Sequence, residues 1–359
     1  MTASRNHNPD APRVIVTGGA GFIGSALVRH LLADTDATVV NVDKLTYAAN
    51  PLTVDGFADN DRHRFVQADI CDRDAMAALF ADVDPDYTVH LAAESHVDRS
   101  IDGPADFIST NVQGTYSLLE AAARQAGKRG DRPAPRFVAV STDEVYGSLG
   151  DEGRFDEDSA YRPNSPYAAT KAAADHLARA WHTTYGLETI VTNASNNYGP
   201  YQFPEKLIPR TILRGLQGQT LEVYGEGTNV RDWIHVDDHA RALWIAANDG
   251  TPGRTYNIGA ACEMRNIDLV RALCAALDAA RPDGAPHNRL ITFVADRPGH
   301  DFRYAIDATR AHEQLGWRPS VDFTQGLRQT VDWYLENQNW WEPILGSSYD
   351  GGRLGLAGT

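Results

Sequence analysis

The sequence predicts an α/β fold in which a doubly wound parallel sheet forms the larger part and a smaller C-terminal α/β domain follows it. Two observations lead to this prediction. The chain has 359 residues, and a usual domain has about 100 to 200, so one large core with a smaller companion is expected. Its first half alternates short β-branched runs with Ala- and Leu-rich stretches of helical period, which indicates repeated βαβ units.

The elements of that half can be placed in order along the chain. The β-branched run RVIVT opens the series, TVVNVD follows the first helical stretch, and later runs repeat the pattern. Such strands are buried on both faces of a parallel sheet. We therefore expect strands at 13–17, 38–43, 64–68, 87–92, 136–141 and 188–193, and helices at 22–33, 73–82, 104–126 and 167–185.

The alternation becomes less regular after residue 195, which suggests a domain boundary there. We expect residues 1–195 to form a nucleotide-cofactor domain, with a polar arm at 1–11, and residues 196–345 to form mainly the substrate domain. Some crossing of the chain between the two parts is expected. The Gly-rich residues 346–359 are expected to be a flexible tail.

Composition excludes several classes of function. The chain has 33 Lys and Arg against 48 Asp and Glu, a net charge of −15 that disfavours nucleic acid as a partner. Its three cysteines are far apart and form no CxxC pair, so neither a disulfide framework nor a metal site is predicted. No apolar run reaches the length of a membrane span, and the N-terminus has no hydrophobic signal segment. A cytoplasmic protein is expected.

A glycine-rich turn follows the first predicted strand and precedes the first helix. Gly18, Gly21 and Gly24 recur every third residue, with Phe22 and Ile23 between the last two. Glycines at these places permit a tight turn and a close approach of the backbone to a pyrophosphate, and the helix N-terminus supplies free amides. In this context the motif predicts a Rossmann fold that binds a dinucleotide.

Acidic residues at the next two strand ends bear on which dinucleotide is bound. Asp43 would accept hydrogen bonds from ribose hydroxyls and repel the additional phosphate of NADP, so NAD is predicted, although Lys44 would weaken that repulsion. Asp69 and Ile70 could meet the adenine. Equally, Asp69 could be the N-cap of the helix that begins near Arg73.

Tyr167 and Lys171 stand four residues apart on one predicted helix, so their side chains share a face. A lysine ammonium near a phenol favours the phenolate, which would lower the pKa of Tyr167 and make it a general base for a sugar hydroxyl. The same spacing also arises by chance on surface helices. The glycine turn upstream favours the catalytic interpretation.

The sequence Thr142, Asp143, Glu144 stands where the fifth strand ends, at the edge of an open α/β sheet where ligands bind. Two neighbouring carboxyl groups in a partly dry cleft repel each other, so one can remain protonated as an acid while the other acts as a base. A solvated acidic turn that caps the next segment is the alternative.

These segments together resemble a known family. TGGAGFIGS, LAAESHVDRSI, STDEVYG, YAATKAAADH, NNYGPYQFPEKLIP, NVRDWIHVDDH and RPGHDFRYAID are similar to the extended short-chain dehydrogenase/reductases, and more closely to the branch that dehydrates dTDP-glucose. The similarity runs from about residue 13 to about residue 341. Ala168 and Thr170 depart from it, since Ser is common at both positions.

The resemblance implies a reaction cycle. Tyr167 takes the proton of the sugar 4-hydroxyl while hydride passes to NAD, Glu144 removes the proton of carbon 5, and Asp143 protonates the departing 6-hydroxyl. Thr142 would hydrogen-bond the 4-oxygen. Hydride then returns to carbon 6, so NAD is regenerated and stays bound. Related 4-epimerases usually lack the acid pair, because their hydride leaves and returns at one carbon.

The resemblance also implies two sets of binding residues. The cofactor set is Gly18, Gly21, Phe22, Ile23, Gly24, Asp43, Lys44, Leu45, Thr46, Asp69, Ile70, Ala92, Ala93, Ser95, Thr110, Tyr167, Lys171 and Asn196. The substrate set is His96, Thr142, Asn197, Lys206, Leu207, Tyr224, Arg231, Asn266, Arg297 and His300. Several members could instead have ordinary structural roles. His96 could be a hydrogen-bonded structural histidine, and Asn196 and Asn197 could form a turn. The residues from 206 onward could form surface ion pairs or belong to the core.

Three functions remain open on the sequence. The first is dehydration of dTDP-glucose to a 4-keto-6-deoxy sugar. The second is another NAD-dependent nucleotide-sugar dehydratase or 4-epimerase acting on a UDP- or GDP-sugar, and the third is a non-catalytic NAD-sensing regulator. The helices near 104–126 and 167–185 resemble those that pair in family dimers, so a homodimer is expected.

Overall fold

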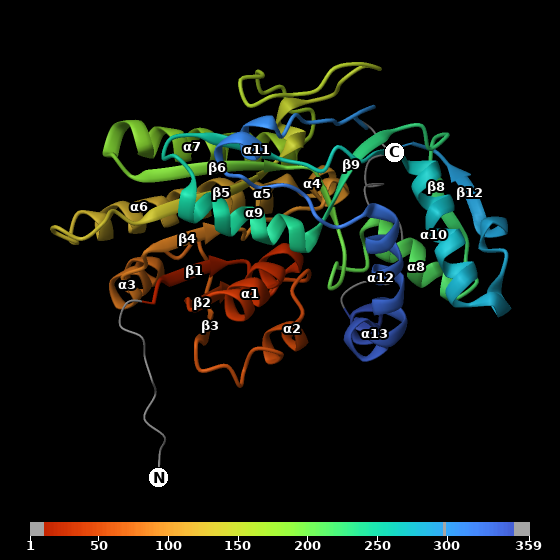
Figure 1. Cartoon of the computed structure of the whole chain (residues 1–359), viewed down its shortest axis with the longest axis horizontal. Coiled ribbons are helices and arrows are strands. Elements are labelled where there is room, and N and C mark those ends of the chain that lie inside the picture. The colour runs from red at the N-terminus through yellow and green to blue at the C-terminus, as the bar shows by residue number, and fades with distance from the viewer. Residues whose placement is uncertain (1–10, 297–298, 348–359) are drawn as a thin grey trace, which may run out of the picture.

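The computed structural model describes residues 11–296 and 299–347. Of the arm expected at 1–11 and the tail expected at 346–359, residues 1–10 and 348–359 lie outside the described residues, whereas 346 and 347 are helical. Seven parallel strands form the central sheet in the order β10-β6-β5-β4-β1-β2-β3 (Figure 1). They are β1 (Arg13–Thr17), β2 (Thr38–Asp43), β3 (His63–Gln67), β4 (Tyr87–His90), β5 (Arg136–Thr142), β6 (Glu188–Ala194) and β10 (Thr255–Ile258).

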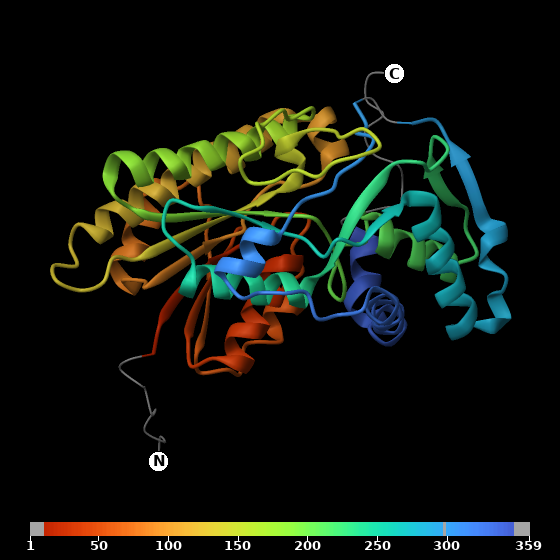
Figure 2. The same cartoon turned by 45° about the horizontal axis from the view of Figure 1, so that its top comes forward.

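Helices cover both faces of this sheet, as Figures 1 and 2 show. One face packs against α1 (Phe22–Asp34), α9 (Val236–Asp249) and α11 (Thr309–Gln314), and the other against α3 (Arg73–Val83), α6 (Thr115–Ala126) and α7 (Pro166–Tyr185). The strands are buried from both sides because their β-branched residues meet apolar helix faces. The predicted doubly wound α/β fold is confirmed.

The helix predicted at 104–126 is not a regular α-helix. It consists of α5 (Pro104–Phe107), a π-helical segment η1 (Ile108–Gly114), and α6. Within η1 the Asn111 side chain accepts from the amide of Glu94 and donates to Thr170 Oγ1, both outside the helix. These tertiary bonds accompany the widened turns, which periodicity along the sequence does not reveal.

The C-terminal part adds two small sheets and a helical layer. One sheet has the order β11-β9-β7 and the other pairs β12 with β8. The bounds are β7 (Asn196–Tyr198), β8 (Leu221–Tyr224), β9 (Val230–His235), β11 (Glu263–Arg265) and β12 (Ile291–Val294), with α8 (Leu207–Leu216), α10 (Asn266–Ala280), α12 (Phe323–Glu336) and α13 (Gln338–Ser347). An aromatic-rich core that includes Trp233, Tyr334 and Trp340 holds this part together.

The chain returns to the large sheet after entering the smaller part. Strand β10 pairs in parallel with β6, with Thr255 opposite Val191, and α9 and α11 pack on the same sheet. Both parts are thereby joined by several crossings, which Figure 2 shows as blue-green segments over the sheet.

The remaining helices are short. They are α2 (Pro51–Asp55), α4 (Val97–Asp102), and the 3₁₀ segments η2 (Asp143–Tyr146), η3 (Pro282–Gly284) and η4 (His287–Leu290). Over residues 11–296 and 299–347, no helix has both the length and the hydropathy that a bilayer crossing requires.

Candidate active site

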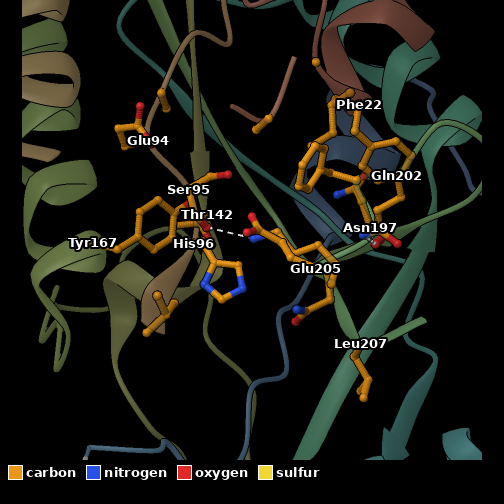
Figure 3. Close-up of a pocket in the computed structure, with 18 of the residues that line it drawn as sticks. Phe22, Glu94, Ser95, His96, Thr142, Tyr167, Asn197, Gln202, Glu205 and Leu207 are labelled. Atoms are coloured by element: carbon orange, nitrogen blue, oxygen red, sulfur yellow. Dashed lines mark hydrogen bonds between the residues drawn. The ribbon is translucent and has the colours of Figure 1, made fainter. Parts of the chain in front are cut away.

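A cavity of about 470 Å³ runs along the carboxyl ends of the central strands and between the two parts of the chain. Its walls come from the glycine turn after β1, the ends of β2, β4, β5 and β6, helix α7, and the segments around α8 and β9. Figure 3 shows side chains from both parts around it, including Phe22, Thr142, Tyr167 and Asn197. Open α/β sheets bind their ligands at this edge.

Two positions of the glycine turn, Gly18 and Gly24, have no space for a side chain. Gly18 has φ +77°, and a Cβ there would lie 2.7 Å from the backbone nitrogen of Ala92. At Gly24 a Cβ would lie 2.1 Å from the carbonyl oxygen of Gly18. The turn and the start of α1 therefore pack at backbone distance, which leaves the helix N-terminus open to the cavity for an anionic group.

Asp43 is fixed at the end of β2 by two backbone amides. Its Oδ2 accepts from Ala20 N at 3.0 Å and its Oδ1 from Leu45 N at 2.8 Å. Burial raises the pKa of Asp43, and these amides oppose the rise. The carboxyl is thus oriented into the cavity wall, where it could accept ribose hydroxyls.

The side chain of Asp69 pairs with Lys44 rather than capping a helix. Lys44 Nζ lies 2.6 Å from Asp69 Oδ2, and both residues line the cavity. The N-cap of α3 is Asp72, which accepts from the amides of Asp74 and Ala75. The N-cap alternative for Asp69 is therefore wrong.

The acid pair after β5 is split between the interior and the cavity. Asp143 is 2% exposed, and burial, together with the charge of Glu144, raises its pKa well above the ordinary value. Glu144 lines the cavity, and its amide donates to Thr142 Oγ1 at 3.3 Å. A protonated acid beside a second carboxyl is the arrangement that acid and base steps on one ligand need.

Tyr167 and Lys171 both line the cavity from α7 and are both buried. Lys171 Nζ donates to the carbonyl oxygen of Val140 at 2.8 Å, and the Tyr167 ring meets Phe107 edge-on. Burial is the largest influence on the pKa of Tyr167 and raises it, and the charge of Glu144 raises it further. The expectation that the Lys171 ammonium lowers the pKa of Tyr167 is wrong, because desolvation and the nearby carboxyl groups raise that pKa above its ordinary value.

The cavity gathers nearly all of the predicted binding residues. Of the cofactor set, all except Leu45 line it, and of the substrate set His96, Thr142, Asn197, Lys206, Leu207, Tyr224, Arg231, Asn266 and His300 do. Arg297 lies outside the described residues. Leu45 contributes its backbone amide to Asp43 instead. Four of the five predicted catalytic residues line the cavity, and the fifth, Asp143, is buried and does not line it.

Protein contacts already position several members of the substrate set. Lys206 Nζ donates to Ser95 O at 3.0 Å, and Tyr224 Oη donates to Asp98 Oδ2 at 3.2 Å. Arg231 donates to the carbonyl oxygen of Asp301 at 3.0 Å. Lys206 and Arg231 both line the cavity, where a lysine ammonium and an arginine guanidinium can meet a phosphate.

The structure also places residues in the cavity wall that the sequence reasoning missed. Tyr304 lies under the guanidinium of Arg231, 4.2 Å from its ring centre, and its hydroxyl donates to Asp301 Oδ2 at 2.5 Å. Tyr304 belongs to the segment RPGHDFRYAID, but nothing in the spacing singles it out. Other polar additions include Glu94, Gln202, Glu205 and His239.

His239 is one of these additions and faces Asn197. The ring Nδ1 lies 2.9 Å from Asn197 Oδ1, whose amide nitrogen donates to Ser195 O at 2.9 Å. Burial lowers the pKa of His239 to about 3, so the ring is neutral and Nδ1 carries the hydrogen. The contact fixes the orientation of the Asn197 amide at the cavity wall.

A cavity lined both by a glycine turn after the first strand and by a tyrosine and lysine pair on a helix defines a class of protein, the extended short-chain dehydrogenase/reductases. Comparison with known proteins is more specific. A family model described as GDP-mannose 4,6 dehydratase matches residues 15–330. A probable dTDP-glucose 4,6-dehydratase from Sinorhizobium fredii is 55% identical over 346 residues, covering 96% of this chain and 99% of that protein.

Further matches agree with that assignment. A dTDP-glucose 4,6-dehydratase from Escherichia coli is 53% identical over 359 residues, covering 96% of this chain and 99% of its own. The crystal structure of the dTDP-glucose 4,6-dehydratase DesIV from Streptomyces venezuelae, which has NAD bound, superposes with a TM-score of 0.86 at 47% identity, covering 92% and 99% of the two chains. The chain belongs to the dTDP-glucose 4,6-dehydratase family.

Proposed function

We propose that this protein converts dTDP-glucose to dTDP-4-keto-6-deoxyglucose with NAD as a resident redox carrier. The observation that supports it best is that Tyr167 and Glu144 line the same cavity as the glycine turn, with Asp143 buried next to Glu144 in the chain. Related dTDP-glucose 4,6-dehydratases match nearly the whole chain.

The residues around the cavity fit NAD. The backbone at Gly18 and Gly24 leaves no room for side chains, as close approach to a pyrophosphate requires, and Asp43 presents a fixed carboxyl for ribose hydroxyls. When bound, NAD supplies a site that accepts hydride from the sugar and later returns it. We assign the cofactor set named above to this role.

The first proton transfer falls to Tyr167. Its phenol oxygen would take the proton of the sugar 4-hydroxyl as the carbon–hydrogen bond at carbon 4 breaks, giving a ketone. Burial disfavours the phenolate, so the charges around it decide when it can act as a base. Lys171 supplies a positive charge from the same helix face.

The elimination falls to the acid pair. Glu144 would remove the proton of carbon 5, which the neighbouring ketone acidifies, and Asp143 would give its proton to the departing 6-hydroxyl as water forms. Asp143 is suited to the acid role because burial and the charge of Glu144 raise its pKa, which favours the protonated form. A 4-epimerase would need neither group, so the presence of both favours the dehydratase over that alternative.

The nucleotide part of the substrate would occupy the side of the cavity formed by residues 196–345. Lys206, Arg231, Tyr224 and Asn266 line it there, and their cationic and aromatic side chains suit a diphosphate and a base. We therefore propose the residues from 196 onward as the nucleotide-sugar domain.

We also propose that the protein is a cytoplasmic homodimer. Ile108 and Tyr185 on the layer of α5, η1, α6 and α7 are large apolar side chains that are 52% and 62% exposed, which suits burial against a second copy. The three cysteines are free thiols, as a reducing compartment favours. Sedimentation of the purified protein tests the dimer, since a monomer across the concentration range would contradict it.

One assay tests the function directly. The purified protein is incubated with dTDP-glucose and, in parallel, with UDP-glucose, and the products are identified by mass and by the ultraviolet absorbance of the 4-keto sugar in alkali. Loss of one water from dTDP-glucose is the expected result. An epimerised sugar of unchanged mass, or no product with either substrate, would contradict the proposal.

The variant Tyr167→Phe tests the proposed role of Tyr167 as the general base. Removing the phenol hydroxyl should lower kcat roughly 100- to 10,000-fold, the usual contribution of a general base, while the NAD content of the protein stays as in the wild type. Wild-type turnover by this variant would point instead to a base other than Tyr167.

A further inference from the structure

A buried carboxylate lies behind the proposed catalytic pair and has no part in the steps above. Asp175 follows Lys171 by four residues on α7 and is 1% exposed. Ser141 Oγ donates to its Oδ2 at 2.7 Å, and Tyr161 Oη donates to the same oxygen at 3.0 Å. Its Oδ1 is buried and has no hydrogen-bond partner within the described part of the chain.

Lys171 needs a counter-charge that its hydrogen bonds do not supply. Its ammonium group donates to the carbonyl oxygen of Val140, and the residue is 5% exposed. Burial lowers the pKa of Lys171, and the negative charge of Asp175 opposes that effect. A buried ammonium without an opposite charge loses its proton instead of remaining charged.

We propose that Asp175 is a positioning residue that keeps Lys171 charged, and that Ser141 and Tyr161 hold the Asp175 carboxylate in place from behind. The geometry carries this assignment: residues four apart on a helix share a face, and both groups are enclosed. The inference rests on the proposed function, because it concerns how Lys171 supports Tyr167 as the base.

The other ionisable groups around the pair do not replace Asp175. His90 on β4 approaches Lys171 from the sheet, but burial lowers its pKa to about 3, so the ring is neutral. Around Asp175 are Tyr146 and Tyr161, both phenols with raised pKa values, and the cation of Arg179. Three carboxyl groups, Glu144, Asp143 and Asp175, lie close enough to Tyr167 that their ionised forms raise its pKa.

The protonation of Asp175 gives the inference a pH dependence. Burial raises its pKa to about 6, opposed by Lys171 and by hydrogen bonds from Ser141 and Tyr161. At neutral pH the carboxylate is therefore charged, and it loses that charge as the pH falls through about 6. Below that pH Lys171 should lose its counter-charge.

The pH profile of kcat tests the inference in Asp175→Asn. Activity needs charged Lys171, so its deprotonation defines the alkaline limb of the profile. Removing the carboxylate lowers the pKa of Lys171, and the alkaline limb should move down by about one to three pH units. Bound NAD and thermal unfolding are measured on the same sample to show that the variant is folded.

Two further variants make the test specific. Tyr161→Phe removes one donor but keeps the carboxylate, so Lys171 keeps its counter-charge and the alkaline limb should stay where it is in the wild type. Glu157→Gln is the matched control, because Glu157 is also buried but lies beside Arg310, at 3.5 Å. Neither limb should move in Glu157→Gln.

Each outcome decides the inference. An unmoved alkaline limb in folded Asp175→Asn, or the same shift in Glu157→Gln, overturns it. If Asp175→Asn does not fold, the smaller neutral variant Asp175→Ser takes its place with the same shift expected, and an unmoved alkaline limb overturns the inference. Failure of the proposed function is distinguishable, because then the wild-type protein itself would not dehydrate dTDP-glucose.

Discussion

The Nε atom of Arg99 lies 3.0 Å from Oε2 of Glu205, and this pair joins α4 to the segment that precedes α8. Tyr47, from the loop after β2, completes the contact: its hydroxyl donates to Glu205 Oε1 at 3.3 Å, and its ring faces the Arg99 guanidinium at 3.7 Å. Three distant segments thus meet at the cavity wall between Thr46 and Ala48, where the predicted cofactor residues lie. The cluster of Arg99, Glu205 and Tyr47 therefore holds these three segments together at the cavity wall.

Glu205→Gln should therefore weaken retention of NAD. The change removes the charge on a side chain that is 1% exposed and weakens a charge-assisted hydrogen bond worth about 1.5 kcal/mol, so NAD should dissociate about tenfold faster. NAD content after gel filtration and the rate of NAD release measure this. Glu188→Gln is the control, because its pair with Arg136 lies at the opposite end of the sheet. Equal loss of NAD in both variants would contradict the prediction.

Gly24→Ala should destabilise the protein and abolish NAD binding. A Cβ at this position would meet the Gly18 carbonyl oxygen at 2.1 Å, so α1 and the glycine turn must separate. Overpacking of this kind costs about 1 to 3 kcal/mol in the free energy of unfolding. Denaturant unfolding and NAD titration are the measurements. Gly150→Ala, where nothing lies within 4 Å, should leave both unchanged.

Glu144→Gln and Asp143→Asn should each stop the reaction after oxidation at carbon 4. Tyr167 can still accept the first proton, but the proton of carbon 5 or the 6-hydroxyl remains in place, so hydride stays on the cofactor. Mixing either variant with dTDP-glucose should produce the near-ultraviolet absorbance of reduced nicotinamide without product. Product at the wild-type rate in either variant would show that its carboxyl group has a different role.

Asp84 should make stability depend on pH. Burial opposes its ionisation, but hydrogen bonds from Arg132, Gln125 and Arg129 outweigh burial and hold its pKa below the ordinary value. Because the folded-state pKa is lower than the unfolded one, the stabilisation is complete at neutral pH and declines as the pH falls below about 4. Asp84→Asn should reduce the free energy of unfolding by about 1 to 2 kcal/mol at pH 7. The difference from the wild type should shrink in acid.

The exposed Asp82 is the control for this prediction. It pairs with Arg64 while 62% of its side chain remains exposed, and surface pairs contribute little. Asp82→Asn should therefore unfold like the wild type at every pH. Thermal unfolding of the wild type, Asp84→Asn and Asp82→Asn is compared from about pH 3 to about pH 8, a range that includes the ordinary carboxyl pKa.

The large sheet was predictable because its signal is local. The first two strands have the predicted ends, Arg13–Thr17 and Thr38–Asp43, since β-branched runs between a helix and a turn leave few alternatives. Strand β10 was not predicted. Its four residues become a strand of this sheet only by pairing with β6, more than sixty residues earlier in the chain.

The site was predictable where a motif carries it. The glycine turn, Asp43, and the pair Tyr167 and Lys171 all line the cavity as expected. Tyr304 and Glu205 depend on chain crossings that only the fold reveals. The raised pKa of Tyr167 was missed for the same reason, since helical spacing gives neighbours along α7 but not the degree of burial.

Strand β10 has a consequence for any attempt to separate the two parts. A fragment that ends at residue 195 would keep six of the seven strands, as the sheet order requires, and would leave the hydrogen-bonding edge of β6 bare. Helix α9, whose apolar face covers the same sheet, would be missing as well. Uncovered strand edges recruit other chains. A fragment truncated in this way should aggregate and precipitate instead of forming an independent cofactor-binding domain. The boundary that the sequence suggests near residue 195 is therefore not a position at which the chain can be divided.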